Sequence, residues 1–490
     1  MAEQIISPGV FQRENDISFI TPAPVEVGAC IVGPTVKGPV EIPTTVTSYN
    51  EYVRVFGDTF DSGSAKQEYL TSIAAKNYFS QGGNTLLVAR VVTGSYTAAT
   101  ATHISSSDKG NFAPFELETL GKGVIYNNST AANDAGKQNS DSSLMTGSLD
   151  NLRWEISNIN NALGTFTLSI RRGDDSLKQK VILETFNDLS LDPNSVNYIA
   201  NAIGDQVKSI SAAGDNIITT GDFVNRSNFV RVKAVNLKTL NYLQNDGVTV
   251  NVDGTNASYS ASLPIAESGS FFGATGDNVV AAKYFDNIDS NTQGLTDGCY
   301  TDRITTLLGN SDDFKFNVLS APGILDQHHN TVVSAFIDLC ESRGDAIFVT
   351  DLRAHGATVS QITGQADTLN SSYAATYWPW LQTISATGQN VFCPTSTFIP
   401  GVYAFTDGAN APWFAPAGLV RGGLTGVIQA ERRLSRSQRD SLYKSKVNPI
   451  ATFPGTGIAV FGQKTLQTKA SALDRVNVRR LLIELKEFIG

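Results

Sequence analysis

Apolar and polar residues follow a helical period between two buried strands in the second half of the chain. Apolar residues of the segment HNTVVSAFIDLCESRG recur three or four positions apart, which places them on one helix face. The flanking segments FKFNVLSAPG and DAIFVTD are short apolar runs typical of buried strands. The order strand, helix, strand predicts a βαβ unit. The residues on the shared helix face are Val332, Val333, Phe336, Ile337 and Cys340.

A similar α/β pattern occupies the first part of the chain. VGACIVG and NTLLVARVV are apolar runs that predict buried strands. Between them, SYNEYVRVFG and AKQEYLTSIAAKNYFSQGG predict two helices, the second ending at Gly82 and Gly83. The residues before this section, 1–22, contain Pro8 and Pro22 and no helical period, so we expect an extended arm.

The middle of the chain has a β pattern. The segments FTLSIRR, KVILETF, FVRVKAV and VTVNV are rich in β-forming residues, and the Asn245–Gly247 and Asp253–Gly254 turns suit hairpins. Residues 126–150 are rich in Asn, Ser, Asp and Gly and predict a long surface loop. The chain is therefore expected to have an α/β core, a mixed sheet with flanking helices, that carries inserted mainly-β domains; overall it is multidomain α+β. The predicted division is an arm (1–22), a discontinuous core (23–93 plus 311–490), and two inserted β domains (94–190 and 191–310).

Two more helices are expected towards the end of the chain. ATVSQITGQADTLN is one candidate, and DRVNVRRLLIELKEFI is an amphipathic helix. Its predicted apolar side consists of Val478, Leu481, Leu482, Leu485, Phe488 and Ile489.

Composition narrows the class of protein. The net charge of −9 argues against direct nucleic-acid binding, which needs clustered cations. No run of about 18 apolar residues and no signal sequence occurs, so we expect no membrane insertion. The cysteines are far apart in the sequence, which favours buried apolar roles over metal binding. They are Cys30, Cys299, Cys340 and Cys393.

Two groups of residues are candidates for chemistry. Asp326 lies close to His328 and His329, but a metal site would need further ligands. The favoured interpretation is a helix N-terminus that Asp326 helps to cap, with both histidines facing solvent. Asp351 ends a predicted strand and precedes His355 by four residues, a position where α/β sheets bind ligands. No nucleophile motif accompanies this pair, so an Asp that caps a loop is favoured. We therefore expect no catalytic, metal or cofactor site.

The segment FPGTGIAVFGQKTLQT resembles a phosphate-binding loop, but Gln463 separates Gly462 from Lys464. A phosphate loop follows a strand and opens a helix, whereas these glycines precede the strand-like IAVFG. The glycines are therefore expected to serve backbone geometry.

One basic stretch stands out in this acidic chain. It is ERRLSRSQRDSLYKSK, with Arg432, Arg433, Arg436 and Arg439. A solvated helix face is the default interpretation, and contact with an acidic protein surface is the alternative.

Ordered motifs over nearly the whole chain resemble one protein family. SPGV (Ser7, Pro8, Gly9, Val10), VGACIVGPTVKGPVEIPTTVTSYNEYVRVFG and ETFNDLSLDPNSVNYI are similar to the arm, first core segment and β domain of contractile tail sheath proteins. YWPWLQT, IPGVYAFTDGANAPWFAPAG, VNPIATFPGTGIAVFGQKTL and DRVNVRRLLIELKEFIG follow in the family's order and most resemble sheaths of T-even-type myophages.

The resemblance implies a structural protein of a phage virion, assembled in the host bacterial cytoplasm, without enzymatic activity. It implies self-assembly into stacked hexameric rings around a tail tube protein, with baseplate and terminator proteins as further partners. The arm motif Ser7–Val10 would join a neighbouring subunit, and Arg432, Arg433, Arg436 and Arg439 would contact the tube or another subunit. Many family members continue past this last helix into a strand-forming arm, which we expect to be absent after residue 490.

Two other classes remain open from the residues alone. An α/β hydrolase or nucleotide-dependent enzyme would depend on Asp351, His355 or Lys464. A tail-tube or adhesin-like β protein would have mostly strands and no βαβ unit.

Overall fold

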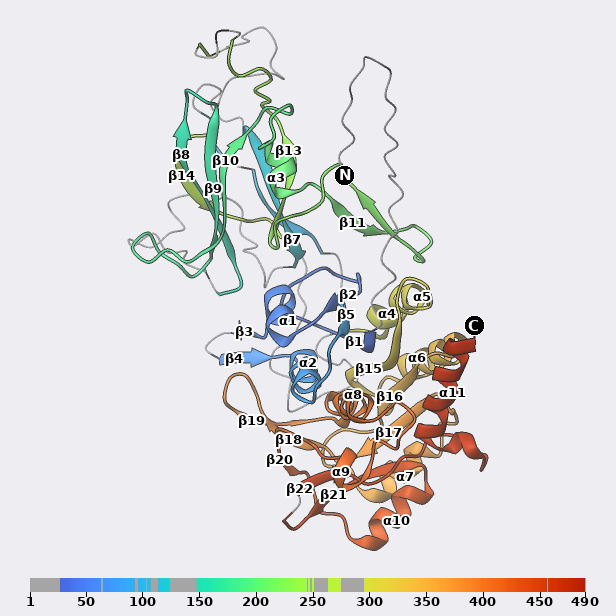
Figure 1. Cartoon of the computed structure of the whole chain (residues 1–490). Coiled ribbons are helices and arrows are strands. Elements are labelled where there is room, and N and C mark those ends of the chain that lie inside the picture. Colours follow the sequence, from blue (N-terminus) through green and yellow to red (C-terminus); the bar gives the residue numbers. More distant parts are fainter. Residues whose placement is uncertain are drawn as a thin grey trace, which may run out of the picture.

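The computed structural model describes most of the chain (Figure 1). The described residues are 27–62, 65–92, 96–102, 104–106, 113–123, 147, 149–244, 246, 249–250, 263–274, 295–455 and 457–489. The arm motif Ser7–Val10, the turn at Asp253 and Gly254, and residues 126–146 of the predicted loop lie outside them.

A mixed sheet forms the core. Its central strands run parallel, and β2 and β22 join antiparallel at the two edges. The strand order is β2 (Thr44–Val46), β5 (Leu86–Arg90), β1 (Val27–Gly33), β15 (Phe316–Leu325), β16 (Ile347–Asp351), β17 (Ala374–Trp378), β21 (Val447–Phe453) and β22 (Gly457–Val460). Every residue of β5, β16 and β17 is buried, as expected for parallel strands covered on both faces. The predicted mixed α+β fold is confirmed.

Helices cover both faces of this sheet. The unit β15–α6–β16 is the predicted βαβ unit, because β15 and β16 are parallel and α6 packs on both. Right-handed crossovers place α6 and α2 on opposite faces, since β15 to β16 and β1 to β5 proceed in opposite directions along the sheet. The core helices are α1 (Tyr49–Phe56), α2 (Leu70–Ser80), α4 (Asp297–Thr301), α5 (Ile304–Leu308), α6 (Asn330–Arg343), α7 (Val359–Ala366), α8 (Ile399–Ala409), α9 (Gly418–Arg421), α10 (Arg436–Lys444) and α11 (Val476–Ile489), with 3₁₀ turns η4 (Thr395–Thr397) and η5 (Ala472–Asp474).

The start of α2 differs from the sequence-based expectation. Residues 65–68 form strand β4 (Ala65–Glu68), which pairs antiparallel with β3 (Thr59–Ser62), and the helix begins only at Leu70. The first helix, α1, agrees with the prediction. Its N-cap Ser48 accepts a hydrogen bond from the backbone N–H of Glu51, and Gly57 ends it at a positive φ of 73°.

The insertion forms a second body at one end of the molecule (Figure 1). Its buried side chains make a hydrophobic cluster separate from that of the core, and both predicted insertions, 94–190 and 191–310, contribute to it. The domain division therefore stays a prediction. The elements are the sheet β10 (Ile182–Ser190), β9 (Thr165–Arg172), β8 (Leu152–Asn160), β14 (Glu267–Ser270); the sheet β13 (Val230–Val235), β7 (Phe115–Lys122), β6 (Ala98–Ala101); the hairpin β11 (Val207–Ile210), β12 (Ile217–Thr220); and α3 (Ile199–Ile203).

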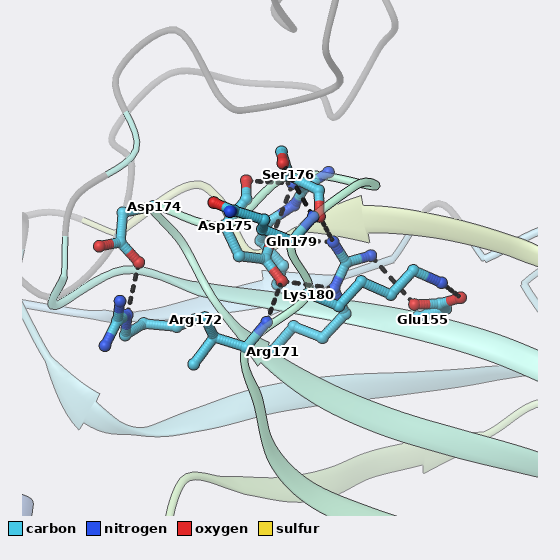
Figure 2. Close-up of polar contacts among 10 residues, drawn as sticks. Glu155, Arg171, Arg172, Asp174, Asp175, Ser176, Gln179 and Lys180 are labelled. Atoms are coloured by element: carbon cyan, nitrogen blue, oxygen red, sulfur yellow. Dashed lines mark hydrogen bonds and ion pairs between the residues drawn. The ribbon is translucent and has the colours of Figure 1, made fainter.

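A buried ionic cluster fastens the loop between β9 and β10 (Figure 2). Asp175 accepts from Arg171 through both carboxylate oxygens, at 2.7 Å from Nε and 2.9 Å from Nη2, and from Arg153 Nη1 at 3.1 Å. All three side chains are fully buried. Glu155 pairs with Arg171 on the outer side and with Lys180. The carboxylates thereby compensate arginines that would otherwise be buried unpaired.

The last helix, α11, packs in the opposite sense to the predicted one. Its buried side chains are Val476, Arg479, Arg480 and Ile483. Leu482, Leu485 and Ile489 of the predicted apolar side are exposed, and Val478 and Leu481 are half-buried. The side chain of Phe488 lies outside the described part. The arginines bury favourably because each stacks on a tyrosine, Arg479 on Tyr373 and Arg480 on Tyr403.

Candidate functional site

The Asp326 cluster is a structural hydrogen-bond network. Asp326 is buried, and its carboxylate accepts from the side chains of Asn330, at 2.8 Å, and Gln365, at 2.6 Å. His329 is the N-cap of α6, so the predicted helix N-terminus is confirmed, but its predicted capping by Asp326 is wrong, because Asp326 accepts from side chains and no side-chain hydrogen bond caps the helix. The expectation that His329 faces solvent is wrong, because it is 1% exposed and its Nδ1 lies 2.6 Å from Asp297 Oδ1. His328 is half-buried. Within the described residues, no group of three or more potential ligands could hold a metal ion.

Asp351 and His355 do not form a catalytic pair. Asp351 is buried at the end of β16, where it accepts from Thr395 Oγ1 at 2.9 Å and from the backbone N–H of Ser396 at 3.2 Å. This confirms the prediction of an Asp that caps a loop, here the start of η4. Burial raises the pKa of Asp351 to about 6. His355 is exposed and packs its ring on Phe392, with centroids 4.5 Å apart.

The glycine-rich segment 453–464 is a hairpin followed by a turn. β21 and β22 pair antiparallel, from Ile450 with Val460 to Phe453 with Gly457. After β22 the chain is held by the buried Asn448, whose Oδ1 accepts from the backbone N–H of Lys464 at 2.6 Å. No helix follows Gly462 directly, and the Lys464 ammonium lies 4.7 Å from the Tyr443 ring centroid. These contacts contradict a phosphate loop and agree with glycines that serve backbone geometry.

The cysteines are free thiols in the structure. Cys30, Cys340 and Cys393 are buried and Cys299 is half-buried. Burial raises the pKa of the Cys30, Cys340 and Cys393 thiols above the ordinary range. Such thiols are poor nucleophiles and metal ligands, so the prediction of apolar roles is confirmed for these three.

The basic stretch divides into stacked and exposed arginines. Arg439 lies between the Phe453 and Phe461 rings, 5.7 and 5.3 Å from their centroids, and Arg432 lies 5.1 Å from the Trp378 ring centroid. Arg433 and Arg436 are exposed, and within the described residues neither has a hydrogen bond, ion pair or ring contact. Because two of these guanidinium groups are engaged within the chain, Arg433 and Arg436 are the ones available to a partner.

A groove of about 710 Å³ adjoins this stretch. It is lined by Gln81 after α2, by α8 and α9, and by the edge strand β20 (Val427–Ala430) and the β21–β22 hairpin. The strand β20 belongs to a small sheet with β18 (Leu381–Ile384) and β19 (Asn390–Cys393). Exposed apolar side chains of Phe405, Val420 and Ile428 line the groove together with Arg432 and Arg433. The groove therefore offers an apolar and cationic surface.

Exposed large apolar side chains are concentrated in one part of the core. Among the described core residues, none lies in 27–92 or 295–383. The sequence did not indicate that these side chains are exposed, because apolar residues in helical or strand patterns are normally assigned to the interior. The exposed residues of the last part are Ile384, Phe405, Trp413, Phe414, Leu419, Val420, Ile428, Phe461, Leu482, Leu485 and Ile489.

No helix in the part of the chain that the structure describes has the length and apolar character needed to cross a bilayer.

Comparisons with known proteins identify relatives of this chain. A family model described as the phage tail sheath protein central domain matches residues 296–466. The tail sheath protein of Vibrio phage KVP40 is 42% identical over 102 residues, which make up 21% of this chain and 15% of that protein. The tail sheath protein of Enterobacteria phage T4 is 39% identical over 101 residues, again 21% of this chain and 15% of that protein.

A crystal structure of a sheath tail protein from Listeria innocua aligns with this chain at 11% sequence identity and a TM-score of 0.49. The alignment covers 94% of this chain and 74% of the Listeria chain. The segment of this chain that aligns with the KVP40 and T4 tail sheath proteins spans only 15% of the length of each of those two proteins. The resemblance that the motifs indicated is confirmed: this chain is similar to the contractile tail sheath proteins of myophages, and its residues 296–466 match the central domain of that family.

Proposed function

We propose that this chain is a structural subunit of a phage contractile tail sheath. Subunits would polymerise around the tail tube in a metastable extended state. Contraction would proceed by rigid-body rearrangement of the subunits and would drive the tube through the host envelope. The free energy would come from exchange of interfaces within the lattice, which needs no nucleotide; the glycines in the β21–β22 hairpin and Lys464 over the Tyr443 ring agree with this.

The observation that carries this proposal is the concentration of exposed apolar side chains in residues 384–489. Phe405, Val420 and Ile428 of this set line one groove, and a set of exposed apolar side chains of this kind favours a protein interface. In this chain it lies in the part of the core that overlaps the family match at 296–466 and extends past it. A subunit enclosed by neighbouring copies and a tube would cover this surface, whereas a solitary enzyme would not.

The arm would tether subunits. Residues 1–22, with the motif Ser7–Val10, would add a strand to an open sheet edge of a neighbour, because main-chain hydrogen bonds hold while the bodies move. The edge strand β20 beside the apolar groove is a suitable acceptor. The proposed tube or subunit contacts by Arg432, Arg433, Arg436 and Arg439 would fall chiefly to the exposed Arg433 and Arg436.

The assembly would consist of stacked hexameric rings in the virion, bounded by baseplate and tail terminator proteins. It would form in the host bacterial cytoplasm. The chain would have no enzymatic activity, which agrees with the separate environments of Asp351 and His355.

Negative-stain electron microscopy of the full chain mixed with its tail tube protein tests the proposal. We expect sheathed tubes built of stacked rings. Tail tubes without a sheath, next to unassembled monodisperse chain, would contradict the proposal if the chain is present at concentrations well above those at which other phage tail proteins assemble. A matched variant with Val420→Asp and Ile428→Asp in the apolar groove should lose the sheath while keeping its melting temperature.

A further inference from the structure

The core and the insertion meet at a junction with several polar contacts. Among the described residues, the hydrophobic clusters of the two bodies share no side chain. The strand β7 of the insertion ends next to the carboxyl end of β5 in the core (Figure 1). The segment 37–41, between β1 and β2, lies at the same place, where Lys37 pairs with Asp150 of the insertion at 3.9 Å. Bodies without a shared apolar core move relative to each other unless specific contacts hold them.

Arg90, the last residue of β5, holds the inner side of this junction. It is fully buried, and its Nη1 donates to the carbonyl oxygens of Gly38, at 2.7 Å, and Lys122, at 2.8 Å. Because Gly38 belongs to the core and Lys122 ends β7, one guanidinium joins the two bodies. The backbone carbonyl of Arg90 accepts from the backbone N–H of Glu41, at 2.8 Å. Arg90 thereby fixes the segment 38–41 against the end of β5.

Glu41 contacts both passages of the chain between the two bodies. Its Oε2 accepts from the Tyr96 hydroxyl at 2.9 Å and lies 3.2 Å from Arg303 Nη1. Tyr96 precedes β6, where the chain enters the insertion, and Arg303 precedes α5, where the chain has returned to the core. The Lys122 ammonium lies 5.4 Å from the centroid of the Tyr96 ring. The Glu41 carboxylate is therefore linked through Tyr96 to the end of β7.

The Glu41 backbone is left-handed, with a φ of 61°. This conformation is unfavourable for a residue with a side chain, whereas glycine adopts it readily. A glutamate at this position indicates a role for the carboxylate that glycine could not fill. Tyr96 is the stronger of its two partners, because the Glu41 side chain is 14% exposed while that of Arg303 is 58% exposed and solvent screens the ion pair.

We propose that the Glu41 carboxylate is a latch that fixes the orientation of the insertion relative to the core, through the hydrogen bond that it accepts from Tyr96. This inference goes beyond the proposed function and does not depend on it. With the latch closed, the core and the insertion move as one body. A rigid-body rearrangement of subunits requires such a connection.

The distance distribution between spin labels on the two bodies tests the latch. The labels are attached to Thr185→Cys on β10 and Ser334→Cys on α6, both exposed, in a full chain that also carries Cys299→Ser. The other three cysteines are buried. Pulsed electron paramagnetic resonance measures the width of the distribution.

Two variants remove the latch from its two sides. Glu41→Gly removes the carboxylate and suits the left-handed backbone, and Tyr96→Phe removes the hydroxyl but keeps the ring beside Lys122. We expect each to broaden the distribution about twofold, because the two bodies then move relative to each other. Glu41→Gln keeps an acceptor for the Tyr96 hydroxyl and should stay close to the wild-type width.

Matched controls lie within the insertion. Tyr242→Phe removes a hydroxyl that donates to the carbonyl of Asn161, and Asn158→Gly places glycine at another left-handed position. Both should leave the width unchanged. Thermal unfolding shows whether each variant is folded, and Glu41→Asn replaces Glu41→Gly if the latter unfolds, since asparagine also tolerates this backbone.

An unchanged width in either Glu41→Gly or Tyr96→Phe would overturn the latch. Broadening in Glu41→Gln as large as in Glu41→Gly would overturn it as well, because the hydrogen bond from Tyr96 would then not be what holds the insertion. These measurements use the unassembled chain, so either result leaves the sheath function standing.

Discussion

Arg480 of α11 forms an ion pair with Asp407 of α8, with 2.5 Å between Nη2 and Oδ2. The Arg480 side chain is only 2% exposed and its guanidinium lies 4.8 Å from the Tyr403 ring centroid. This pair joins the last helix to the core through polar contacts while leucines of the same helix face outward. The pair thus sets which side of α11 is presented to partners.

Removing the carboxylate should loosen α11. Asp407→Asn leaves a buried guanidinium without its counter-charge, which we expect to lower the free energy of unfolding by about 2–3 kcal/mol. Urea unfolding measures the change. The control Arg54→Gln breaks the exposed pair with Glu51 and should cost less than about 1 kcal/mol. Equal small effects for both variants would show that the buried pair does not hold the helix.

The ionic cluster of the insertion should stabilise the insertion alone. Asp175→Asn removes the charge that compensates Arg153 and Arg171, so we expect a local loss of about 3–5 kcal/mol. Hydrogen exchange should accelerate in β8 and β9 and remain unchanged in β16 and β17, because the insertion and the core have separate hydrophobic clusters. Faster exchange throughout the core would show instead that the two bodies unfold together.

The raised pKa of Asp351 should make the free energy of unfolding depend on pH, with a sign that can be predicted. Burial raises its pKa from the ordinary 3.8 to about 6, so the folded state favours the protonated carboxyl. The stability of the wild type relative to Asp351→Asn should therefore rise as the pH falls from 7 to 4, by at most about 3 kcal/mol. Chemical unfolding of both proteins at a series of pH values measures this difference. A difference that is constant with pH, or that falls on acidification, contradicts a pKa of Asp351 that burial has raised.

The stacked and exposed arginines should differ in their effect on stability. Arg439→Gln removes contacts with both Phe453 and Phe461 and should lower the free energy of unfolding by about 1 kcal/mol. Arg436→Gln removes no contact within the chain and should leave the melting temperature unchanged or slightly higher, since it removes a cation from a helix N-terminus. Thermal unfolding of the two single variants decides the comparison, and a larger loss for Arg436→Gln would be the contrary result.

Gly462 should tolerate no side chain. A Cβ at this position would lie 2.9 Å from Asn448 Oδ1 and 2.9 Å from Pro449 Cδ, so Gly462→Ala should destabilise the chain by about 1–3 kcal/mol. At Gly364, within α7, a Cβ meets no atom within 4 Å, and Gly364→Ala should stabilise by up to about 1 kcal/mol. Thermal or urea unfolding measures both changes. A neutral Gly462→Ala would mean that the turn after β22 has room to spare.

Sequence reasoning predicted the elements whose pattern is local. The unit β15–α6–β16 was predictable because its apolar runs and helical period lie within one continuous segment, residues 316–351. The start of α2 was not, since residues 65–68 pair with β3 across a short hairpin and strand pairing overrides their helical pattern.

Contacts between distant segments account for the remaining errors. His329 contacts Asp297, which lies 32 residues before it. The inward face of α11 is set by Tyr373 and Tyr403, which both precede the helix by more than seventy residues. Periodicity assigned the leucines of α11 to the interior because it counts apolar side chains and has no information on aromatic partners for arginine. The buried Asn448, which accepts a hydrogen bond from the backbone of Lys464, also carried no signal in the sequence, because its partner lies 16 residues away.

The most direct test of the sheath function is cryo-electron microscopy of the full chain assembled with its tail tube protein. A helical lattice in which residues 384–489 face the tube and neighbouring copies is the expected result. Bare tubes, or a lattice in which residues 384–489 remain exposed to solvent, would contradict it.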